Sequence, residues 1–295
     1  MTLTIDIVLS QRDDLGESPL WNCNEQSLYW IDSRRRLVQR LHPMSGAYQS
    51  WSMPQDIGSI ALCKSGRILV ALQNELQFLD IETGLLSPFV AIQHPAERMR
   101  LNDGRTDKAG RLCLGSLVLG RHEHHGVLYQ IDAAGQVKEL DKGFYVSNTT
   151  CFSPDGQWLY FADSLARQIW RYAYNTQTGH VGPRQAFIDT QGTQSGPDGA
   201  TVDSEGRLWV ALVLTGQLAC YSPKGELLQI IKLPVPFPTC PSFGGPDLDT
   251  LYVTSIRDSG NLLKSDDPRS GALIAIKGLD ARGLPEILFA DQPGI

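Results

Sequence analysis

The stretch "DGATVDSEGRLWVALVLTGQLACYSPKG" (198–225) has the layout of three short β-strands separated by tight turns. Runs of apolar, β-branched and aromatic residues alternate with Gly-containing turns, which is the pattern of antiparallel strands joined as hairpins. The apolar residues show no sustained helical period, in this stretch or elsewhere. The stretch therefore predicts an all-β fold built from hairpins.

The same layout recurs along the whole chain. Aligned on the residue equivalent to Leu208, the units follow one another at intervals of 40 to 49 residues. A strand-rich period of about 40–50 residues is typical of a β-propeller, in which each blade is a four-stranded sheet. The regular spacing disfavours a sandwich or an open barrel, so we expect one six-bladed β-propeller domain over residues 1–295. The repeated segments are 24–33, 65–73, 109–117, 155–164, 205–213 and 248–256.

The two ends of the chain lie outside these six units. "LTIDIVL" (3–9) and "ILFA" (287–290) both have strand-like composition. We expect them to pair in one blade and close the ring, because closure removes the exposed edges that a sheet must otherwise protect. The Pro-rich "LPVPFPTCP" (233–241) is too short for a domain linker and is interpreted as an extended connection between blades.

Composition and charge exclude several classes of partner. The net charge of −6 argues against nucleic acid, which requires a basic face for its phosphates. No apolar run reaches the roughly 20 residues that span a bilayer, and the N-terminal residues lack the order of a signal peptide. Six cysteines without CxxC spacing are expected to be reduced and packed as small hydrophobes. We therefore expect a cytoplasmic protein without a membrane partner, either a monomer or a weak homo-oligomer.

One position recurs ten or eleven residues before the aligned residue of each unit, at the start of a short predicted strand. In a propeller this is the first strand of the blade, which lines the central channel, so equivalent residues form a ring around the axis. Four of the six positions carry a carboxylate or a carboxamide. The ring consists of Glu17, Gly58, Asn102, Asn148, Asp198 and Cys240.

Buried carboxylates cost free energy unless a cation or hydrogen bonds compensate them, and the ring itself contains no lysine or arginine. One divalent ion is the natural partner, and oxygen ligands favour Ca²⁺, Mg²⁺ or Mn²⁺, with Zn²⁺ also possible. The alternative is purely structural. Asn102-Asp103-Gly104 and Asp198-Gly199 are also ordinary turn sequences, and Glu17-Ser18-Pro19 also fits a surface loop.

Several motifs of this chain occur together in one known family. The sequence resembles the senescence-marker-protein/gluconolactonase family, which includes regucalcin, in unbroken order from about residue 16 to residue 258. The resemblance rests on "GESPLW" (16–21), "RLNDGRTDKAGR" (100–111), "SNTTCFSPDGQWLYFADS" (147–164), "PDGATVDSEGRLWVA" (197–211) and "LPVPFPTCPSFGG" (233–245).

The resemblance implies a fold and a function. It implies a six-bladed β-propeller that hydrolyses a sugar lactone, such as an aldonolactone, with one divalent metal ion in the channel. It implies that Glu17, Asn148 and Asp198 bind the metal and that Asp198 is also the general base. It further implies that Arg100 and Asn102 contact the lactone.

The chain departs from the family pattern at two places. The family commonly has Asn-Gly after the ligand asparagine, whereas this chain has Asn148-Thr149-Thr150. Before the "GVLY" strand, where family members place a glutamate that binds sugar hydroxyls, the chain reads "GRHEHHGVLY" (120–129). Glu123 or His122 is the candidate for that role. The stretch from His122 to His125 also suggests a zinc site, although a loop over the pocket that faces an anionic group of the substrate is favoured.

The chemistry of lactone hydrolysis fits these residues. A divalent ion polarises the carbonyl, a carboxylate accepts the proton of water, and an arginine orients the substrate oxygens. Two alternatives remain open, which are another hydrolase on the same scaffold, such as a phosphotriesterase, and a non-enzymatic calcium-binding propeller. The chain contains no G-x-S-x-G motif, no phosphate-binding loop and no dinucleotide fingerprint.

Overall fold

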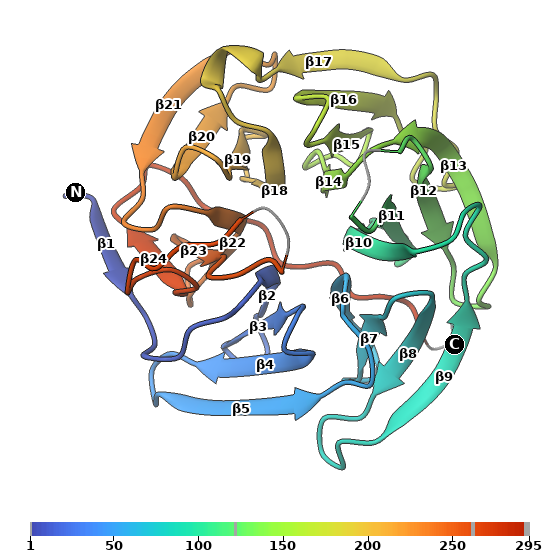
Figure 1. Cartoon of the computed structure of the whole chain (residues 1–295), viewed down its shortest axis with the longest axis horizontal. Helices are drawn as coiled ribbons and strands as arrows, with labels where there is room; N and C mark the ends of the chain where they lie inside the picture. The colour runs from blue at the N-terminus through green and yellow to red at the C-terminus, as the bar shows by residue number, and fades with distance from the viewer. Residues whose placement is uncertain (1, 121–122, 261–262, 292–295) are drawn as a thin grey trace.

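The computed structural model describes residues 2–120, 123–260 and 263–291. Over these residues the strands form six four-stranded antiparallel sheets, arranged like blades around a common central axis (Figure 1). The predicted all-β, six-bladed β-propeller is confirmed. Within the described ranges, helical structure is confined to the short 3-10 helix Gln191–Thr193, and no helix is long and apolar enough to cross a membrane.

Within each sheet, the four strands are ordered from the central axis to the outer rim. The innermost strands are β2 (Gly16–Asn22), β6 (Ser59–Leu62), β10 (Met99–Thr106), β14 (Ser147–Phe152), β18 (Pro197–Val202) and β22 (Pro238–Gly244). The second strands are β3 (Ser27–Asp32), β7 (Ile68–Ala71), β11 (Leu112–Val118), β15 (Trp158–Asp163), β19 (Leu208–Leu212) and β23 (Thr250–Ser255). The third strands are β4 (Leu37–His42), β8 (Glu75–Leu79), β12 (Gly126–Ile131), β16 (Gln168–Ala173), β20 (Gln217–Tyr221) and β24 (Ile274–Lys277). The outermost strands are β5 (Ala47–Ser52), β9 (Leu86–Ala91), β13 (Val137–Phe144), β17 (Gln185–Asp189), β21 (Leu227–Lys232) and β1 (Thr4–Ile7).

The ring is closed by the N-terminal strand. β1 pairs antiparallel with β24, in a register that runs from Thr4 opposite Lys277 to Ile7 opposite Ile274. The sixth blade thus combines one strand from the start of the chain with three strands from its end, which confirms that the N-terminal strand closes the ring, although its partner is β24. The Pro-rich stretch is a connection only up to residue 237, since Pro238 begins the innermost strand β22. Prolines are tolerated there because an innermost strand is an edge strand.

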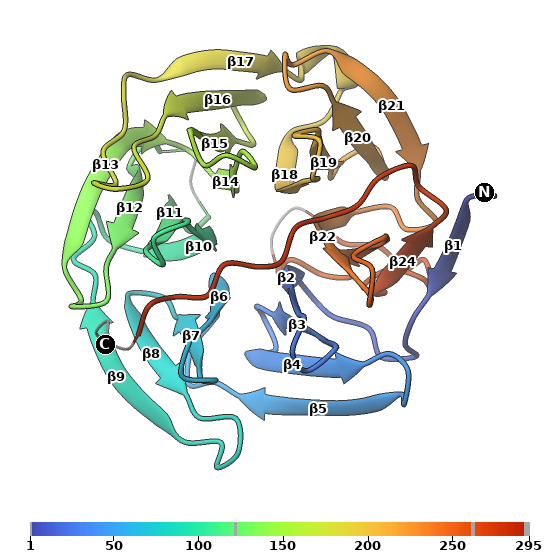
Figure 2. The same cartoon turned by 180° about the vertical axis from the view of Figure 1, so that it is seen from behind.

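The expectation for residues 287–290 was wrong, because they do not pair in the closing blade. The C-terminal segment instead crosses one face of the propeller, as seen from behind in Figure 2. The backbone of Phe289 hydrogen-bonds Leu62 and Lys64. Its ring is fully buried beside Phe78 and Phe89 of the second blade. β1 already occupies the edge of β24, so the apolar Phe289 is buried between two other blades instead.

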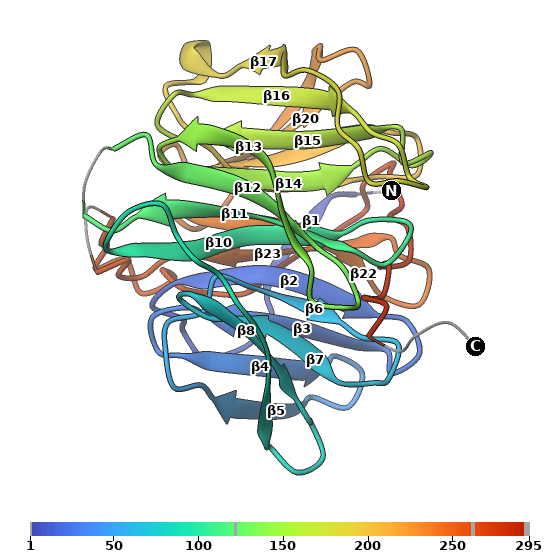
Figure 3. The same cartoon turned by 90° about the vertical axis from the view of Figure 1, so that its right-hand side faces the viewer.

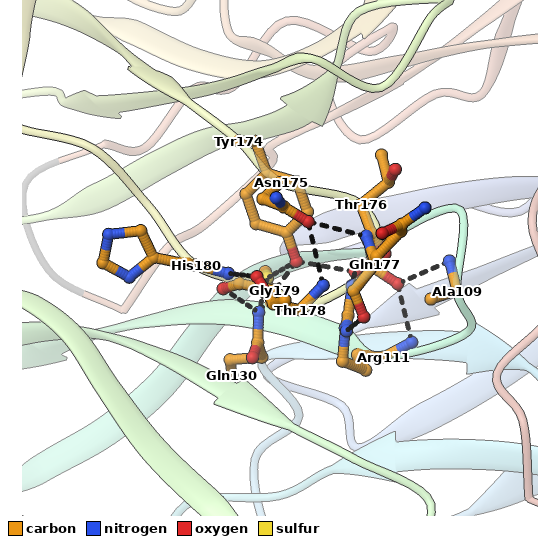
Figure 4. A network of polar contacts seen from close by, with 12 residues as sticks. Ala109, Arg111, Gln130, Tyr174, Asn175, Thr176, Gln177, Thr178, Gly179 and His180 are labelled. Carbon is orange, nitrogen blue, oxygen red and sulfur yellow. Dashed lines mark hydrogen bonds and ion pairs between the residues drawn. The ribbon is translucent and has the colours of Figure 1, made fainter.

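Packing between neighbouring blades is reinforced by polar contacts near their turns. The guanidinium of Arg111, in the turn after β10, donates to the carbonyl oxygens of Thr176 at 2.7 Å and Gln177 at 3.1 Å, in the fourth blade (Figure 4). The amide of Gln130 donates to the Tyr174 hydroxyl at 2.7 Å and to the Gly179 carbonyl at 3.0 Å. These bonds join the third and fourth blades, both of which contribute to the candidate site.

Candidate active site

Five of the ring residues lie in the innermost strands, and the sixth directly precedes one. β2, β10, β14, β18 and β22 each contain a register shift at or next to the ring position, for example between Asn148 and Cys151 in β14. Such a bulge bends the strand and redirects a side chain, and bulges are common beside active sites. The sixth ring position, Gly58, precedes β6, where a β-carbon would lie 2.5 Å from the carbonyl oxygen of Leu101. Glycine therefore allows the second and third blades to approach closely.

The backbone is strained directly after two of the ring residues. Ser18 follows Glu17 with φ of 51°, and Thr149 follows Asn148 with φ of 59°. Both values lie in the left-handed region that non-glycine residues rarely adopt. A neighbouring blade holds each residue in place. Ser18 Oγ accepts a hydrogen bond from the backbone N–H of Ile60 at 3.1 Å, and Thr149 Oγ1 donates to the carbonyl oxygen of Asp198 at 2.5 Å.

Glu17 and Asp198 interact electrostatically across the channel. Burial raises the pKa of Glu17 well above its ordinary value, and the negative charge of Asp198 raises it further. Burial likewise raises the pKa of Asp198, and Asp103 adds to the effect. The positive charge of Arg100 acts in the opposite direction on both pKa values. The two carboxylates, 181 positions apart in the sequence, therefore belong to one charged group.

The two ring asparagines contact each other. Asn102 Nδ2 donates to Asn148 Oδ1 at 3.0 Å and to the carbonyl oxygen of Ser147 at 2.8 Å. Asn148 Nδ2 donates to Ser164 Oγ at 2.8 Å, and this hydroxyl donates in turn to the carbonyl oxygen of Pro197 at 2.7 Å. The chain of bonds spans the third, fourth and fifth blades. It fixes the amide plane of Asn148, whose carbonyl oxygen keeps a second lone pair for another partner.

A cavity of about 410 Å³ opens over this group. Asn148, Asp198 and Arg100 are among its polar lining residues. Its walls are largely apolar, and they include Leu15, Leu117, Leu119, Val146, Val213 and Leu214. In the side view, β11 ends at the face opposite the C-terminal segment (Figure 3). A concave apolar pocket with a few convergent polar groups is the usual form of a small-molecule site.

Only some of the site residues predicted from the sequence line the cavity. Asp198, Asn148 and Arg100 line the cavity, and Asn102 contacts Asn148. Glu17 interacts with Asp198 and Arg100 through its charge.

The described residues 123–125, which precede β12, do not line the cavity. Glu123 is half-buried, does not line the cavity and lies 3.7 Å from His125 Nε2. The ring of His124 packs on Tyr145, with centroids 3.7 Å apart. His122 lies outside the described residues.

Sequence reasoning missed several residues of the site. Asp103 accepts a hydrogen bond from the backbone N–H of Thr150 at 2.6 Å, and its charge acts on both Glu17 and Asp198. Its position beside Asn102 in the "NDG" stretch was the available signal. Arg34 and Asp56 line the cavity although neither stands at a ring position. Arg34 comes from the loop between β3 and β4, and Asp56 from the connection between the first and second blades, where the repeat pattern gives no information about side-chain direction.

The donor set of this group fits a divalent ion. In the described part of the chain, no three or more His, Cys, Asp and Glu side chains form a metal-binding cluster, so a site here needs the Asn148 amide oxygen beside the Glu17 and Asp198 carboxylates. Carboxylate and amide oxygens are the ligands that hard cations prefer. Burial and the mutual repulsion of the acids raise both pKa values, and a bound cation would relieve this repulsion. Arg100 supplies part of that charge, and burial lowers its own pKa.

A comparison with protein families matches residues 15–257 to the SMP-30/gluconolactonase/LRE-like region. The chain belongs to the SMP-30/gluconolactonase/LRE-like family. The matched region contains every candidate site residue discussed above, and the family resemblance inferred from the motifs is confirmed.

Known proteins match this chain over nearly its full length. A 6-deoxy-6-sulfogluconolactonase of Pseudomonas putida is 35% identical over 98% of this chain and 100% of the relative. The pentonolactonase XacC of Haloferax volcanii is 31% identical over 96% of this chain and 97% of the relative. Among solved structures, a calcium-binding regucalcin from Agrobacterium tumefaciens is 28% identical, with a TM-score of 0.90 and 96% of each chain covered. The lactonase names of the first two agree with the predicted enzyme class.

Proposed function

We propose that this protein is a metal-dependent lactonase that opens a sugar lactone to the corresponding sugar acid. The observation that carries the proposal is the convergence of Asp198, Asn148 and Arg100 on one cavity, with Glu17 in electrostatic contact with Asp198. The names of the Pseudomonas putida and Haloferax volcanii relatives support a sugar lactone as the substrate class.

Glu17, Asn148 and Asp198 would hold one divalent ion, for which we propose Ca²⁺, Mg²⁺, Mn²⁺ or Zn²⁺. The regucalcin structure described as calcium-binding supports a divalent ion in this fold. The chemistry that such an ion supplies when bound is polarisation of the lactone carbonyl and stabilisation of the charge that develops on its oxygen.

The side chains carry the remaining roles. Asp198 accepts a proton from water while the water oxygen bonds to the acyl carbon. The bond between the acyl carbon and the ring oxygen then breaks, and the proton is returned to the leaving alkoxide, which becomes a hydroxyl. Arg100 binds substrate oxygens with its planar donor fork, and Asn102 hydrogen-bonds a hydroxyl of the lactone. Glu123 or His122 is proposed to contact a sugar hydroxyl.

The apolar walls of the cavity assist this reaction. They exclude bulk water from the reacting carbonyl, and a lower local dielectric strengthens the interactions of Arg100 and Asp198 with the substrate. The hydrogen bonds that fix Asn148 hold its carbonyl oxygen in one orientation before the substrate binds. The six cysteines are free thiols, which suits the reducing cytoplasm that we propose as the location.

The experiment that tests the proposal is a lactone panel measured by pH-stat. Purified protein is supplied with each divalent ion in turn and assayed on glucono-, galactono- and arabinonolactone, and in parallel on the organophosphate paraoxon. We expect lactone hydrolysis that is faster than paraoxon hydrolysis. Turnover of paraoxon alone would identify a phosphotriesterase, and metal binding in calorimetry without any turnover would identify a binding protein.

A further inference from the structure

Three consecutive arginines follow strand β3, and only two of them have a carboxylate within ion-pair distance among the described residues. Arg36 Nε lies 2.9 Å from Asp56 Oδ1, and Arg35 Nε lies 4.0 Å from Asp32 Oδ2. Arg34 is exposed and lines the cavity that contains Asp198. No carboxylate in the described part of the chain lies within 4.0 Å of its guanidinium. Within the described ranges, Arg34 is therefore a cation at the cavity without an ion-pair partner of its own.

The position of the Arg34 side chain is defined by packing against the sixth blade. A β-carbon at Gly260 would lie 1.6 Å from Arg34 Nη1 and 2.0 Å from its Cζ, so the guanidinium packs directly on the backbone of Gly260. Gly260 also has φ of 71°, which other residues rarely adopt. Ser259, next to it, lines the same cavity. The glycine thus leaves the space that the guanidinium occupies at the cavity.

The acidic groups near Arg34 are already engaged by other cations. Asp258, whose charge interacts with Arg34, accepts a hydrogen bond of 2.8 Å from Lys264 Nζ. Asp56 lines the cavity but is bonded to Arg36. Asp198 lies deeper, with 7% of its surface exposed, in the group proposed to bind the ion. Asp56 and Asp258 are thus paired with other cations, which leaves the Arg34 charge available at the exposed edge, whereas Asp198 lies at the deeper end.

We infer that Arg34 forms an anion-binding subsite, which selects lactones that carry a negatively charged substituent away from the reacting carbonyl. The inference rests on the proposed lactonase function, because it assigns the substrate class of that same cavity. The shared chemistry is a group with two or three equivalent oxygens, such as a sulfonate, a carboxylate or a phosphate. A guanidinium binds two oxygens of such a group with parallel hydrogen bonds.

The arrangement explains why the anion and the reacting carbonyl do not compete for one cation. The lactone carbonyl is placed at the deeper end, near Asp198 and Arg100, while the charged substituent reaches Arg34 at the exposed edge. The charge of the substituent is thereby kept away from the carboxylates of Glu17 and Asp198. An anion bound next to those acids would instead be repelled.

The test compares a neutral and an anionic lactone on matched variants. The values of kcat and KM are measured for gluconolactone and for its analogues with a sulfonate or a phosphate at C6. The proteins are the wild type, Arg34→Gln, Arg34→Lys, Gly260→Ala and the control Arg35→Gln. For Arg34→Gln we expect kcat/KM on the anionic lactones to fall on the order of tenfold to hundredfold, mainly through KM, as for loss of a charged hydrogen bond. The loss on gluconolactone should be at least tenfold smaller.

The other variants separate charge from position. Arg34→Lys keeps the charge and should recover part of the loss, whereas Gly260→Ala should reproduce it by displacing the guanidinium. Arg35→Gln should leave kcat/KM unchanged on both the neutral and the anionic lactones. The sulfonate and phosphate arms show which anion fits better. Equal losses on neutral and anionic lactones, or no loss on either, would overturn the subsite.

A binding measurement keeps this result distinct from failure of the lactonase proposal. Calorimetry compares a methyl glucoside with its C6-sulfonated counterpart, neither of which contains a lactone. Tighter binding of the sulfonated compound, lost in Arg34→Gln and weakened by salt, supports the subsite even if no lactone is hydrolysed. Equal binding of both compounds by the wild type contradicts it, whatever the hydrolysis assay gives.

Discussion

The hydroxyl of Thr149 donates a hydrogen bond of 2.5 Å to the backbone carbonyl oxygen of Asp198. The two residues stand on the innermost strands β14 and β18, so the bond fixes one blade against the next at the candidate site. Thr149 makes it from a left-handed backbone conformation with φ of 59°. The strain next to Asn148 is thus offset by a contact that helps to position the proposed base.

We predict that Thr149→Val is more harmful than Thr149→Gly. Valine keeps the strain and removes the hydroxyl, and we expect it to lower the free energy of unfolding by about 1–3 kcal/mol. Glycine also loses the hydrogen bond but relieves about 1 kcal/mol of backbone strain. Urea denaturation measures the order of stabilities, and kcat measures the positioning of Asp198. A Thr149→Val protein as stable as wild type would show that the bond contributes little.

We predict that Asp198→Asn lowers kcat by about 10²- to 10⁴-fold while the fold is retained. The amide cannot accept the proton of water, and it removes one of the negative charges that raise the pKa of Glu17. The measurements are lactone hydrolysis by pH-stat and circular dichroism for the fold. Asp189→Asn, which changes an exposed carboxylate on the outer strand β17, is the matched control. Hydrolysis close to the wild-type rate would remove Asp198 from the role of base.

The ring positions could be predicted from the sequence because the repeat imposes them. A propeller places equivalent residues of every blade at equal distance from the axis, so the spacing that aligns Leu28 with Leu208 also aligns Glu17 with Asp198. Arg34 and Asp56 could not be found in this way, since they come from loops whose side-chain directions depend on contacts with other blades. The period gives no information on such contacts.

The placement of residues 287–290 shows a second limit of the repeat pattern. Strand-like composition indicates that Phe289 should be buried, and it is, but composition does not say which edge receives it. Either strand-like end of the sequence could have paired with the outer edge of β24, and β1 is the one that does. The bulges at Glu17 and Asn148 were equally inaccessible to prediction, because left-handed Ser18 and Thr149 contradict the local preference of those residue types.

Asp13 provides a prediction about pH. Burial and the charge of Asp32 raise its pKa to about 7, although its carboxylate accepts hydrogen bonds of 2.9 Å from Trp30 Nε1 and Gln39 Nε2. The folded state binds the proton of Asp13 more tightly than the unfolded state does. The contribution of the protonated Asp13 to the stability of the fold is therefore fully present below the ordinary pKa of 3.8. It is lost as the pH rises from there through about 7.

We therefore expect Asp13 to cost the folded protein on the order of 4 kcal/mol between pH 4 and pH 8. Asp13→Asn cannot ionise, so its stability should depend less on pH over this interval. Urea unfolding of the metal-free protein at several pH values measures the difference. Both proteins are kept metal-free, so that the titration of Glu17 and Asp198 contributes equally to the two pH profiles. Identical pH profiles for the two proteins would contradict the prediction.

The last prediction concerns the C-terminal segment on the face opposite the cavity. Glu286 Oε2 lies 3.3 Å from Arg105 Nη1, with 14% and 11% of the two side chains exposed. Burial raises the pKa of Glu286, and Arg105 acts to lower it. Removing one partner of a buried ion pair leaves the other charge uncompensated, which typically costs about 3–5 kcal/mol.

We expect Glu286→Ala to lower the free energy of unfolding by that amount. Phe289→Ala, which empties the apolar site between the second and third blades, should cost a similar 3–5 kcal/mol. Arg269→Gln breaks an exposed ion pair with Asp267 and should leave the unfolding midpoint unchanged. Because the segment lies opposite the cavity, kcat of the folded fraction should fall much less than stability. A variant that loses kcat without losing stability would instead connect this face of the channel to the reaction.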